Sequence, residues 1–154
     1  TALVLSRQPV PTLDRKRFAS AEGLARGAYV LSDPPGGRPD LILIASGSEV
    51  GLIVAAGEIL QKQSLAVRLV SMPSWELFEA QPRSYREAVL PPGVTARLAV
   101  EAGVSLGWER YVGPEGDVVA IDRFGASAPG DVVLKEFGFQ VVHVCQRALA
   151  LREN

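Results

Sequence analysis

The feature that most constrains the fold is a run of five apolar residues, Leu41–Ala45, that leads directly into a helical pattern. A continuous apolar run of this length is typical of a strand covered on both faces. From Glu49 to Gln63 apolar residues recur at spacings of three and four, which predicts a helix, and Ala66–Val70 predicts the next strand. Because a helix connects the two strands, the sequence predicts a unit of parallel strands with the helix packed on their sheet.

The same alternation continues along the chain. Short apolar runs predict further strands at Ala28–Leu31, Ala96–Val100 and Val118–Ile121. Helical spacing predicts helices at Trp75–Ala80 and Arg83–Val89, and a last helix anchored by Val141, Val144, Cys145, Ala148 and Leu149. We therefore expect an α/β fold with a mainly parallel sheet and helices on both faces.

The first part of the chain has a different character. Gln8–Ala25 contains two prolines, several charges and no sustained apolar period, which indicates a linker that crosses the surface. Ahead of it, Thr1 is not a methionine and runs straight into the apolar residues Ala2–Leu5, which are typical of a buried strand. We therefore expect the sequence to begin inside a longer protein. Its 154 residues suffice for one domain, which we expect to start near Gly27.

The composition argues against several broad classes of protein. With 16 basic and 17 acidic residues the formal net charge is -1, which gives no reason to expect nucleic acid or an anionic membrane surface as a partner. No window approaches the ~18 apolar residues of a membrane span. Cys145 is the only cysteine, so no internal disulfide can form, in agreement with a reducing cytoplasm as the location.

The turn Ser46-Gly47-Ser48, between a predicted strand and a predicted helix, is the first candidate site. Free backbone N–H groups and the helix dipole could bind an anion there. The spacing matches neither the dinucleotide fingerprint nor the Walker loop, and Glu49 would repel a phosphate. We therefore favour a structural role, in which the hydroxyl of Ser48 or Ser46 caps the helix.

His143 and Cys145 suggest a nucleophile with its base, but residues two apart on a helix point away from each other. We expect Cys145 in the core and His143 outside it. One histidine and one cysteine also cannot supply a zinc site with three or four such ligands.

Two further groups of residues are candidates for contacts. The segment Asp122–Pro129 follows a predicted strand and so lies at the carboxyl edge of the sheet, where α/β folds often bind ligands. It could contact a ligand or a partner, but we favour a loop whose Asp122 and Arg123 charges are solvated. We expect four aromatic residues to pack in the core or against a partner: Trp75, Phe78, Trp108 and Tyr111.

Eight segments in order resemble the carboxyl-terminal end of transketolases. They read LSRQ, GAYVL, ILIASGSEV, VRLVSMPS, YREAVLP, ARLAVEAG, RFGASAP and EFGF, and together they extend over nearly all of the chain. The resemblance implies a homodimeric enzyme of the pentose phosphate pathway, with its active sites at the subunit interface. This enzyme uses thiamine diphosphate with Mg²⁺ or Ca²⁺ to move a two-carbon ketol group from a ketose phosphate to an aldose phosphate.

The resemblance also implies how the chain is divided. Residues 1–22 would be the end of the pyrimidine-binding middle domain with a linker, and residues 23–154 the carboxyl-terminal domain. In that family this domain has a five-stranded mixed sheet whose first strand is antiparallel, which assigns Ala28–Leu31 to that strand. The family's cofactor-binding, metal-binding and catalytic residues lie upstream of Thr1. We therefore expect no catalytic, cofactor-binding or metal-binding residue here, and no activity or cofactor binding by this portion alone.

Two positions follow from the resemblance. Arg7 occupies the arginine position of the LSRQ segment, which in the family binds the phosphate of the sugar substrate, a role that suits a permanently charged guanidinium. Gln140 stands where the family often has a threonine, so we expect the last helix to be less well capped.

Two alternatives remain open at this point. One is a free-standing anion- or nucleotide-binding regulatory α/β domain that uses the ASGSEV turn. The other is a sister enzyme of the same superfamily that acts on a different ketose or a 2-oxo acid, although the arginine of the LSRQ segment favours a phosphorylated sugar. The encoded sequence ahead of Thr1 would separate the first alternative from a transketolase.

Overall fold

A five-stranded mixed sheet forms the centre of the chain in the computed structural model, which describes residues 8–152. The strands lie in the order β1-β3-β2-β4-β5. β1 is antiparallel to β3, and the other neighbours are parallel, which confirms the predicted mixed sheet and its antiparallel first strand. The strands are β1 (Tyr29–Ser32), β2 (Leu41–Ala45), β3 (Val67–Ser71), β4 (Arg97–Val100) and β5 (Asp117–Val119).

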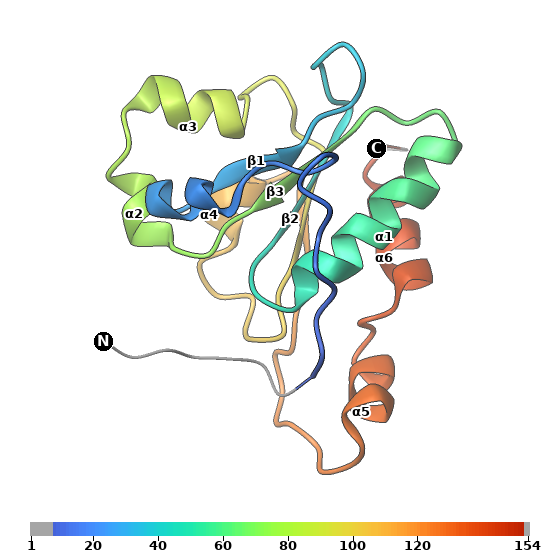
Figure 1. The fold of residues 1–154 in the computed structure, drawn as a ribbon. Coiled ribbons are helices and arrows are strands. Elements are labelled where there is room, and N and C mark those ends of the chain that lie inside the picture. Colours follow the sequence, from blue (N-terminus) through green and yellow to red (C-terminus); the bar gives the residue numbers. More distant parts are fainter. Residues whose placement is uncertain (1–7, 153–154) are drawn as a thin grey trace.

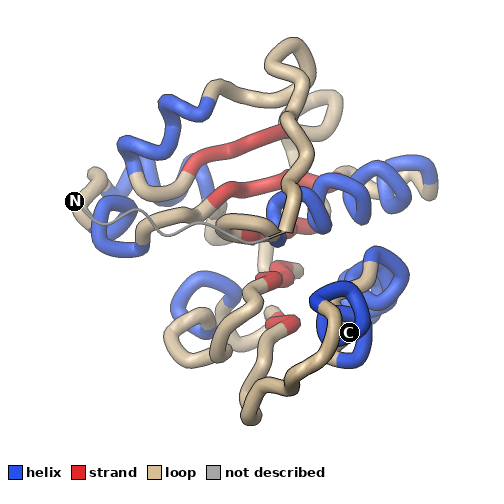
Figure 2. Tube along the Cα trace, turned by 60° about the horizontal axis from the view of Figure 1, so that its bottom comes forward, coloured by secondary structure: helices blue, strands red, loops and turns tan. Residues whose placement is uncertain are grey.

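Helices cover both faces of the sheet, as predicted (Figures 1 and 2). Buried side chains of α1 and α6 join the core on one face, and those of α2, α3 and α4 join the core on the other. The helices are α1 (Glu49–Lys62), α2 (Trp75–Glu79), α3 (Arg83–Val89), α4 (Glu109–Val112), α5 (Gly130–Glu136), α6 (Val141–Ala150) and the 3₁₀ helix η1 (Ala21–Arg26).

β2 divides the apolar core into two layers. All five of its residues are fully buried, and alternate side chains point to opposite faces of the sheet. Leu41, Leu43 and Ala45 belong to the cluster under α1 and α6, whereas Ile42 and Ile44 belong to the cluster under α2, α3 and α4. The apolar run that predicted a doubly covered strand therefore lies at the centre of the fold.

The aromatic side chains form one group on the α2–α4 face. Trp108 and Tyr111 are almost completely buried, and the Trp75 ring meets the Trp108 ring edge-on at 5.2 Å between centroids. Phe78 lies 6.1 Å from Tyr111 by the same measure. The expectation that these residues pack in the core is confirmed.

The segment before β1 is more than a surface linker, and that prediction was wrong in part. Phe18 packs into the core under α1, and the backbone N–H of Ala19 donates a hydrogen bond to the Leu31 carbonyl at 2.9 Å. η1 then extends over residues 21–26, across the expected division between residues 22 and 23. That division stays a prediction, because the fold does not test it.

Gly27 joins η1 to β1 at a point where only glycine fits. Its φ is +81°, and a Cβ atom there would lie 2.2 Å from the backbone nitrogen of Phe78. The close approach lets the Gly27 carbonyl accept a hydrogen bond from the Ser74 N–H at 3.0 Å. The start of α2 is thereby held against the first strand.

Arg68 is a buried charge in the middle of β3. Its guanidinium donates to both carboxylate oxygens of Asp33, at 2.6 and 3.1 Å, and to the carbonyls of Ala88 and Val89, at 2.7 and 3.0 Å. These bonds tie the end of α3 and the turn after β1 to the sheet. The strand that contains Arg68 was predicted from the sequence, but the hydrogen-bond partners of Arg68 were not.

Sequence and structure differ otherwise at the ends of elements. The predicted strands and helices are displaced by at most one or two residues, and the short helices α4 and α5 were not predicted. Within residues 8–152, no helix has both the length and the apolar character that crossing a membrane would require.

Candidate functional site

The loops that follow β2, β4 and β5 meet at the carboxyl edge of the sheet, below α1 in Figure 1. Hydrogen bonds join the loop after β4 to the loop after β5. The N–H of Ile121 donates to the Gly103 carbonyl at 2.8 Å, and the N–H of Ser105 donates to Asp122 Oδ1 at the same distance. This edge is where an open α/β sheet commonly binds its ligands.

The turn between β2 and α1 is built by backbone hydrogen bonds. The N–H of Glu49 donates to the Ser46 carbonyl at 3.2 Å. A residue that caps a helix usually has extended backbone angles. Ser48 already has helical angles, φ -67° and ψ -27°, and its side chain accepts no capping hydrogen bond. The Ser46 hydroxyl donates instead to Glu101. The prediction that Ser48 or Ser46 caps this helix was therefore wrong.

Both serine hydroxyls are bound to carboxylates. Ser48 Oγ donates to Glu49 Oε1 at 2.5 Å, and Ser46 Oγ donates to Glu101 Oε2 at 3.0 Å. Glu49 is buried, and Glu101, which follows β4, is half-buried. Burial raises the pKa of Glu101, the Ser46 hydrogen bond lowers it, and the nearby charge of Glu49 raises it. The mouth of α1 is thus an acidic site.

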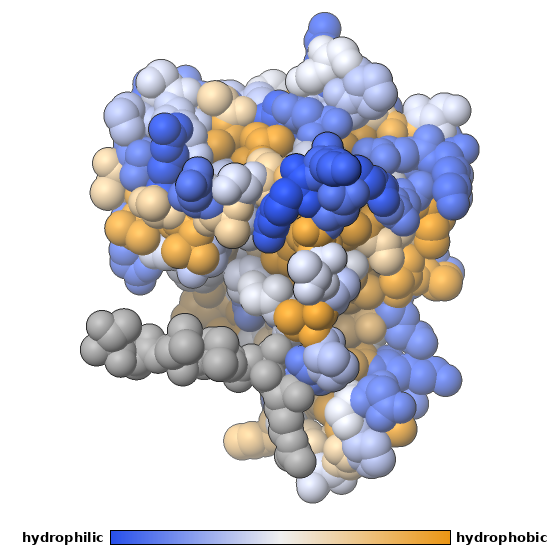
Figure 3. Space-filling view, viewed as in Figure 1, coloured by the Kyte–Doolittle hydropathy of each residue, from blue (hydrophilic) through white to orange (hydrophobic). Residues whose placement is uncertain are grey.

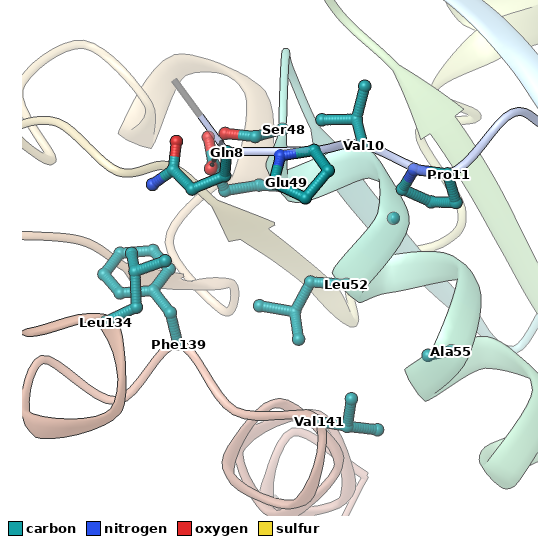
Figure 4. Close-up of a pocket in the computed structure, with 12 residues that line it drawn as sticks. Gln8, Val10, Pro11, Ser48, Glu49, Leu52, Ala55, Leu134, Phe139 and Val141 are labelled. Atoms are coloured by element: carbon teal, nitrogen blue, oxygen red, sulfur yellow. Dashed lines mark hydrogen bonds between the residues drawn. The ribbon is translucent and has the colours of Figure 1, made fainter. Parts of the chain in front are cut away.

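A groove of about 360 Å³ opens beside this mouth (Figure 4). Gln8, Ser48 and Glu49 supply its polar end, and Leu134 and Phe139 lie on the opposite wall. Apolar side chains are visible in the space-filling view between the start of the described chain and α1 (Figure 3). Among the described residues that line the groove there is no lysine or arginine, so its chemistry does not suit a phosphate.

His143 and Cys145 do not form a reactive pair. Cys145 lies in the core under α1, where its thiol donates to the Ala56 carbonyl at 3.7 Å, and burial raises its pKa. His143 Nδ1 lies 2.8 Å from the Gly138 carbonyl. The buried position of Cys145 is confirmed, and His143 is half-buried and lies outside the buried core, as expected.

The loop after β5 has more partners than predicted. Asp122 accepts the Ser105 N–H, and the Arg123 guanidinium lies 4.6 Å above the centre of the Phe137 ring. Both charges were expected to be only solvated. The next residue in the chain, Phe124, is 98% exposed.

Phe124 belongs to a group of exposed apolar side chains at this edge, which we call the carboxyl-edge patch. Val104 is 59% exposed and Leu106 is 78% exposed, and both lie on the loop after β4. The bonds from Ile121 and Ser105 join that loop to the loop of Phe124, so the three side chains are carried by two connected loops. Apolar residues gathered in this way mark contact surfaces more often than scattered ones do. Sequence patterns did not identify the patch, since Val104 and Leu106 belong to no periodic segment.

Two expectations concern the ends of the described region. Gln140 precedes α6, and its side chain makes no capping hydrogen bond, as expected for a glutamine at this position. Arg7, the predicted phosphate-binding residue, lies outside the described residues, so its role stays a prediction. Between residues 8 and 152, no group of three histidine, cysteine, aspartate or glutamate side chains is placed to hold a metal ion.

A family model described as the transketolase-like TK C-terminal domain matches residues 27–140. A transketolase of Geobacillus stearothermophilus is 58% identical over 151 residues, which are 98% of this chain and 23% of that protein. The chain therefore spans about a quarter of the length of this relative.

Solved structures agree with the family match. A transketolase from Leishmania mexicana superposes with a TM-score of 0.80 and 47% identity, and the match covers 88% of this chain and 19% of that one. A transketolase of Pichia stipitis in complex with sedoheptulose 7-phosphate gives a TM-score of 0.82 at 34% identity, over 94% of this chain and 20% of that one.

The acidic mouth of α1 generates a prediction for Glu101→Gln. A carboxyl group whose pKa is raised by folding favours the folded state when protonated, and that stabilisation is lost as the pH rises from about 4.5 through the raised value. Glutamine keeps an acceptor for the Ser46 hydroxyl and cannot ionise. We expect the unfolding free energy of the variant to increase relative to wild type as the pH rises above about 4.5, and the difference to be constant below it.

Urea unfolding between pH 3.5 and 8 measures this difference. Glu115→Gln is the matched control, because Glu115 is exposed and the same charge is removed there. A pH dependence that is equal in the two variants would show that burial of Glu101 and the charge of Glu49 do not matter.

Proposed function

Because this chain belongs to the transketolase-like C-terminal domain family, we propose that it is the carboxyl-terminal portion of a transketolase. The observation that carries the proposal is the match of nearly the whole chain, at 58% identity, to about a quarter of a longer enzyme. The complete protein would transfer a two-carbon ketol group from a ketose phosphate to an aldose phosphate in the pentose phosphate pathway. Its setting would be the cytoplasm, and its active form a homodimer.

Within that enzyme, this portion supplies contacts and one substrate-binding residue, and the chemistry takes place elsewhere. The family implies thiamine diphosphate and Mg²⁺ or Ca²⁺ as cofactors. The described residues do not fit them: no three metal-ligating side chains converge between residues 8 and 152, and the groove at the carboxyl edge is lined by Glu49 without a basic partner. We therefore derive no catalytic step for these residues. The same acidic groove argues against a free-standing anion-binding domain that uses this turn.

The carboxyl-edge patch supports a role in domain or subunit contacts. Val104, Leu106 and Phe124 are exposed apolar side chains on two connected loops. Burying a large apolar side chain is worth about 1.5–3 kcal/mol, so a surface of this kind gains stability when another surface covers it. We propose that the upstream domains or the second subunit cover this patch in the complete enzyme.

The cofactor proposal predicts that residues 1–154 alone bind no thiamine diphosphate. The acidic groove and the absence of three converging metal ligands among residues 8–152 give the physical reason. Isothermal titration of this portion with thiamine diphosphate and Mg²⁺ is the measurement, and the full-length protein is the positive control. A dissociation constant in the micromolar range for the portion would contradict the proposal.

The contact proposal predicts that Phe124→Ser destabilises the full-length protein. If the Phe124 ring is buried there, its loss lowers the unfolding free energy by about 1.5–3 kcal/mol. Thermal unfolding of the full-length protein measures the effect. Val142→Ser is the control, because Val142 is 65% exposed on α6, away from the patch. Equal melting temperatures for the wild type and Phe124→Ser would mean that nothing covers this side chain.

The substrate proposal predicts that Arg7→Ala, in the full-length enzyme, weakens the use of phosphorylated sugars selectively. Loss of hydrogen bonds from a charged group costs about 1.5–3 kcal/mol, or roughly 10- to 150-fold in apparent affinity. A donor without a phosphate, such as hydroxypyruvate, has no partner for the guanidinium and should be affected much less.

The measurement is kcat/KM for a ketose phosphate and for hydroxypyruvate, in the wild type and the variant. Thiamine diphosphate affinity serves as a check that the cofactor site is intact. Equal losses with both donors would show that Arg7 supports the fold and does not hold the phosphate.

A further inference from the structure

A second, basic pocket lies on the opposite face of the sheet from α1. It has a volume of about 470 Å³ and is formed by α2, α3, α4 and the start of β4, the group of helices on the left of Figure 1. Four arginines and two glutamates line it, in contrast to the acidic groove beside α1. The charged lining residues are Glu79, Arg83, Arg86, Glu87, Arg97 and Arg110.

The glutamates neutralise only two of the arginines. Arg83 donates to Glu87 at 2.6 Å, and Arg86 donates through Nη1 to Glu79 at 2.7 Å. Arg97 is held by backbone carbonyls, among them the Tyr111 carbonyl at 2.8 Å, and these do not cancel its charge. Arg110 is exposed, and no carboxylate among the described residues lies within 4.0 Å of it. The pocket therefore keeps a positive charge.

Two buried polar atoms of the pocket residues have no hydrogen-bond partner among residues 8–152. They are Arg86 Nε and the hydroxyl oxygen of Tyr111, a side chain that is only 2% exposed. A buried polar group without a partner is costly, so such atoms are rare in folded proteins. Burial raises the pKa of the Tyr111 hydroxyl most, the neighbouring Glu79 carboxylate raises it further, and the neighbouring Arg110 lowers it, so both charged groups lie close to this hydroxyl although neither meets the geometry of a hydrogen bond. Both atoms are thus unpaired hydrogen-bond donors on residues that line the pocket.

We propose that this pocket binds the phosphate group of a small molecule, with Arg110, Arg86 and Tyr111 as its donors. Phosphate oxygens only accept hydrogen bonds, and their negative charge would balance the arginines that have no carboxylate partner. Their geometry also matches the planar guanidinium of Arg86. The volume exceeds that of a phosphate ion alone and falls in the range of pockets for small ligands. Phe78 and Leu90 supply an apolar wall for the rest of such a molecule. Binding at this pocket does not depend on the proposed reaction.

The test is isothermal titration of the full-length protein with inorganic phosphate and with glycerol 3-phosphate, at constant low ionic strength. All variants are made in an Arg7→Ala background, so that phosphate bound by Arg7 does not contribute. We expect saturable binding, and an increase in the dissociation constant of at least about tenfold in Arg110→Gln and in Tyr111→Phe. Tighter binding of glycerol 3-phosphate assigns the site to a phosphate ester, and tighter binding of inorganic phosphate assigns it to the free ion.

Arg38→Gln is the matched control. Arg38 is an exposed arginine in the turn between β1 and β2, away from the pocket, so the variant removes the same charge without touching the site. Tyr111→Phe removes only a hydroxyl that has no partner among the described residues, so we expect its melting temperature to be unchanged or higher. Absence of saturable binding, or equal dissociation constants in all variants, would overturn the proposal.

Discussion

The burial of β2 on both faces is the constraint on which the rest of the structure depends. A strand of five apolar residues in the middle of a sheet must be covered twice, and this requires two layers of helices. α1 and α6 provide one layer, and α2, α3 and α4 provide the other. The division also separates the two pockets: the acidic groove belongs to the first layer, and the basic pocket to the second.

Arginine side chains hold the short elements of the second layer in place. Helices as short as α2, α3 and α4 gain little stability from their own hydrogen bonds, because nucleating a helix is costly. Arg68 and Arg97 donate from β3 and β4 to carbonyl groups at the ends of α3 and α4. The carbonyls that a helix end leaves without partners are thus satisfied by charged groups fixed in the sheet. Those two arginines are therefore part of the scaffold, while Arg110 is left available.

Periodicity in the sequence predicted the elements that are long or continuously apolar. β2 and α3 were predicted with their bounds unchanged, α1 ends one residue earlier than predicted, and β3 is displaced by one residue. Patterns failed where a contact distant in sequence decides the structure. Phe18 packs into the core from a segment that has no period, and the Ser46 hydroxyl binds Glu101, 55 residues away, and caps no helix. The carboxyl-edge patch was missed for the same reason, since the two loops meet only after the sheet has formed.

The burial of Cys145 makes the thiol a natural probe of the interface between α1 and α6. It is the only cysteine in the sequence, and its sulfur lies against the Ala56 carbonyl of α1. A thiol reagent reacts with the thiolate form of cysteine and must reach the sulfur atom. Burial raises the pKa of the Cys145 thiol and blocks access to it. The rate at which such a reagent modifies Cys145 would therefore follow the rate or the equilibrium of separating these two helices. The protein thus carries its own kinetic marker for the local opening of this layer, with no label added.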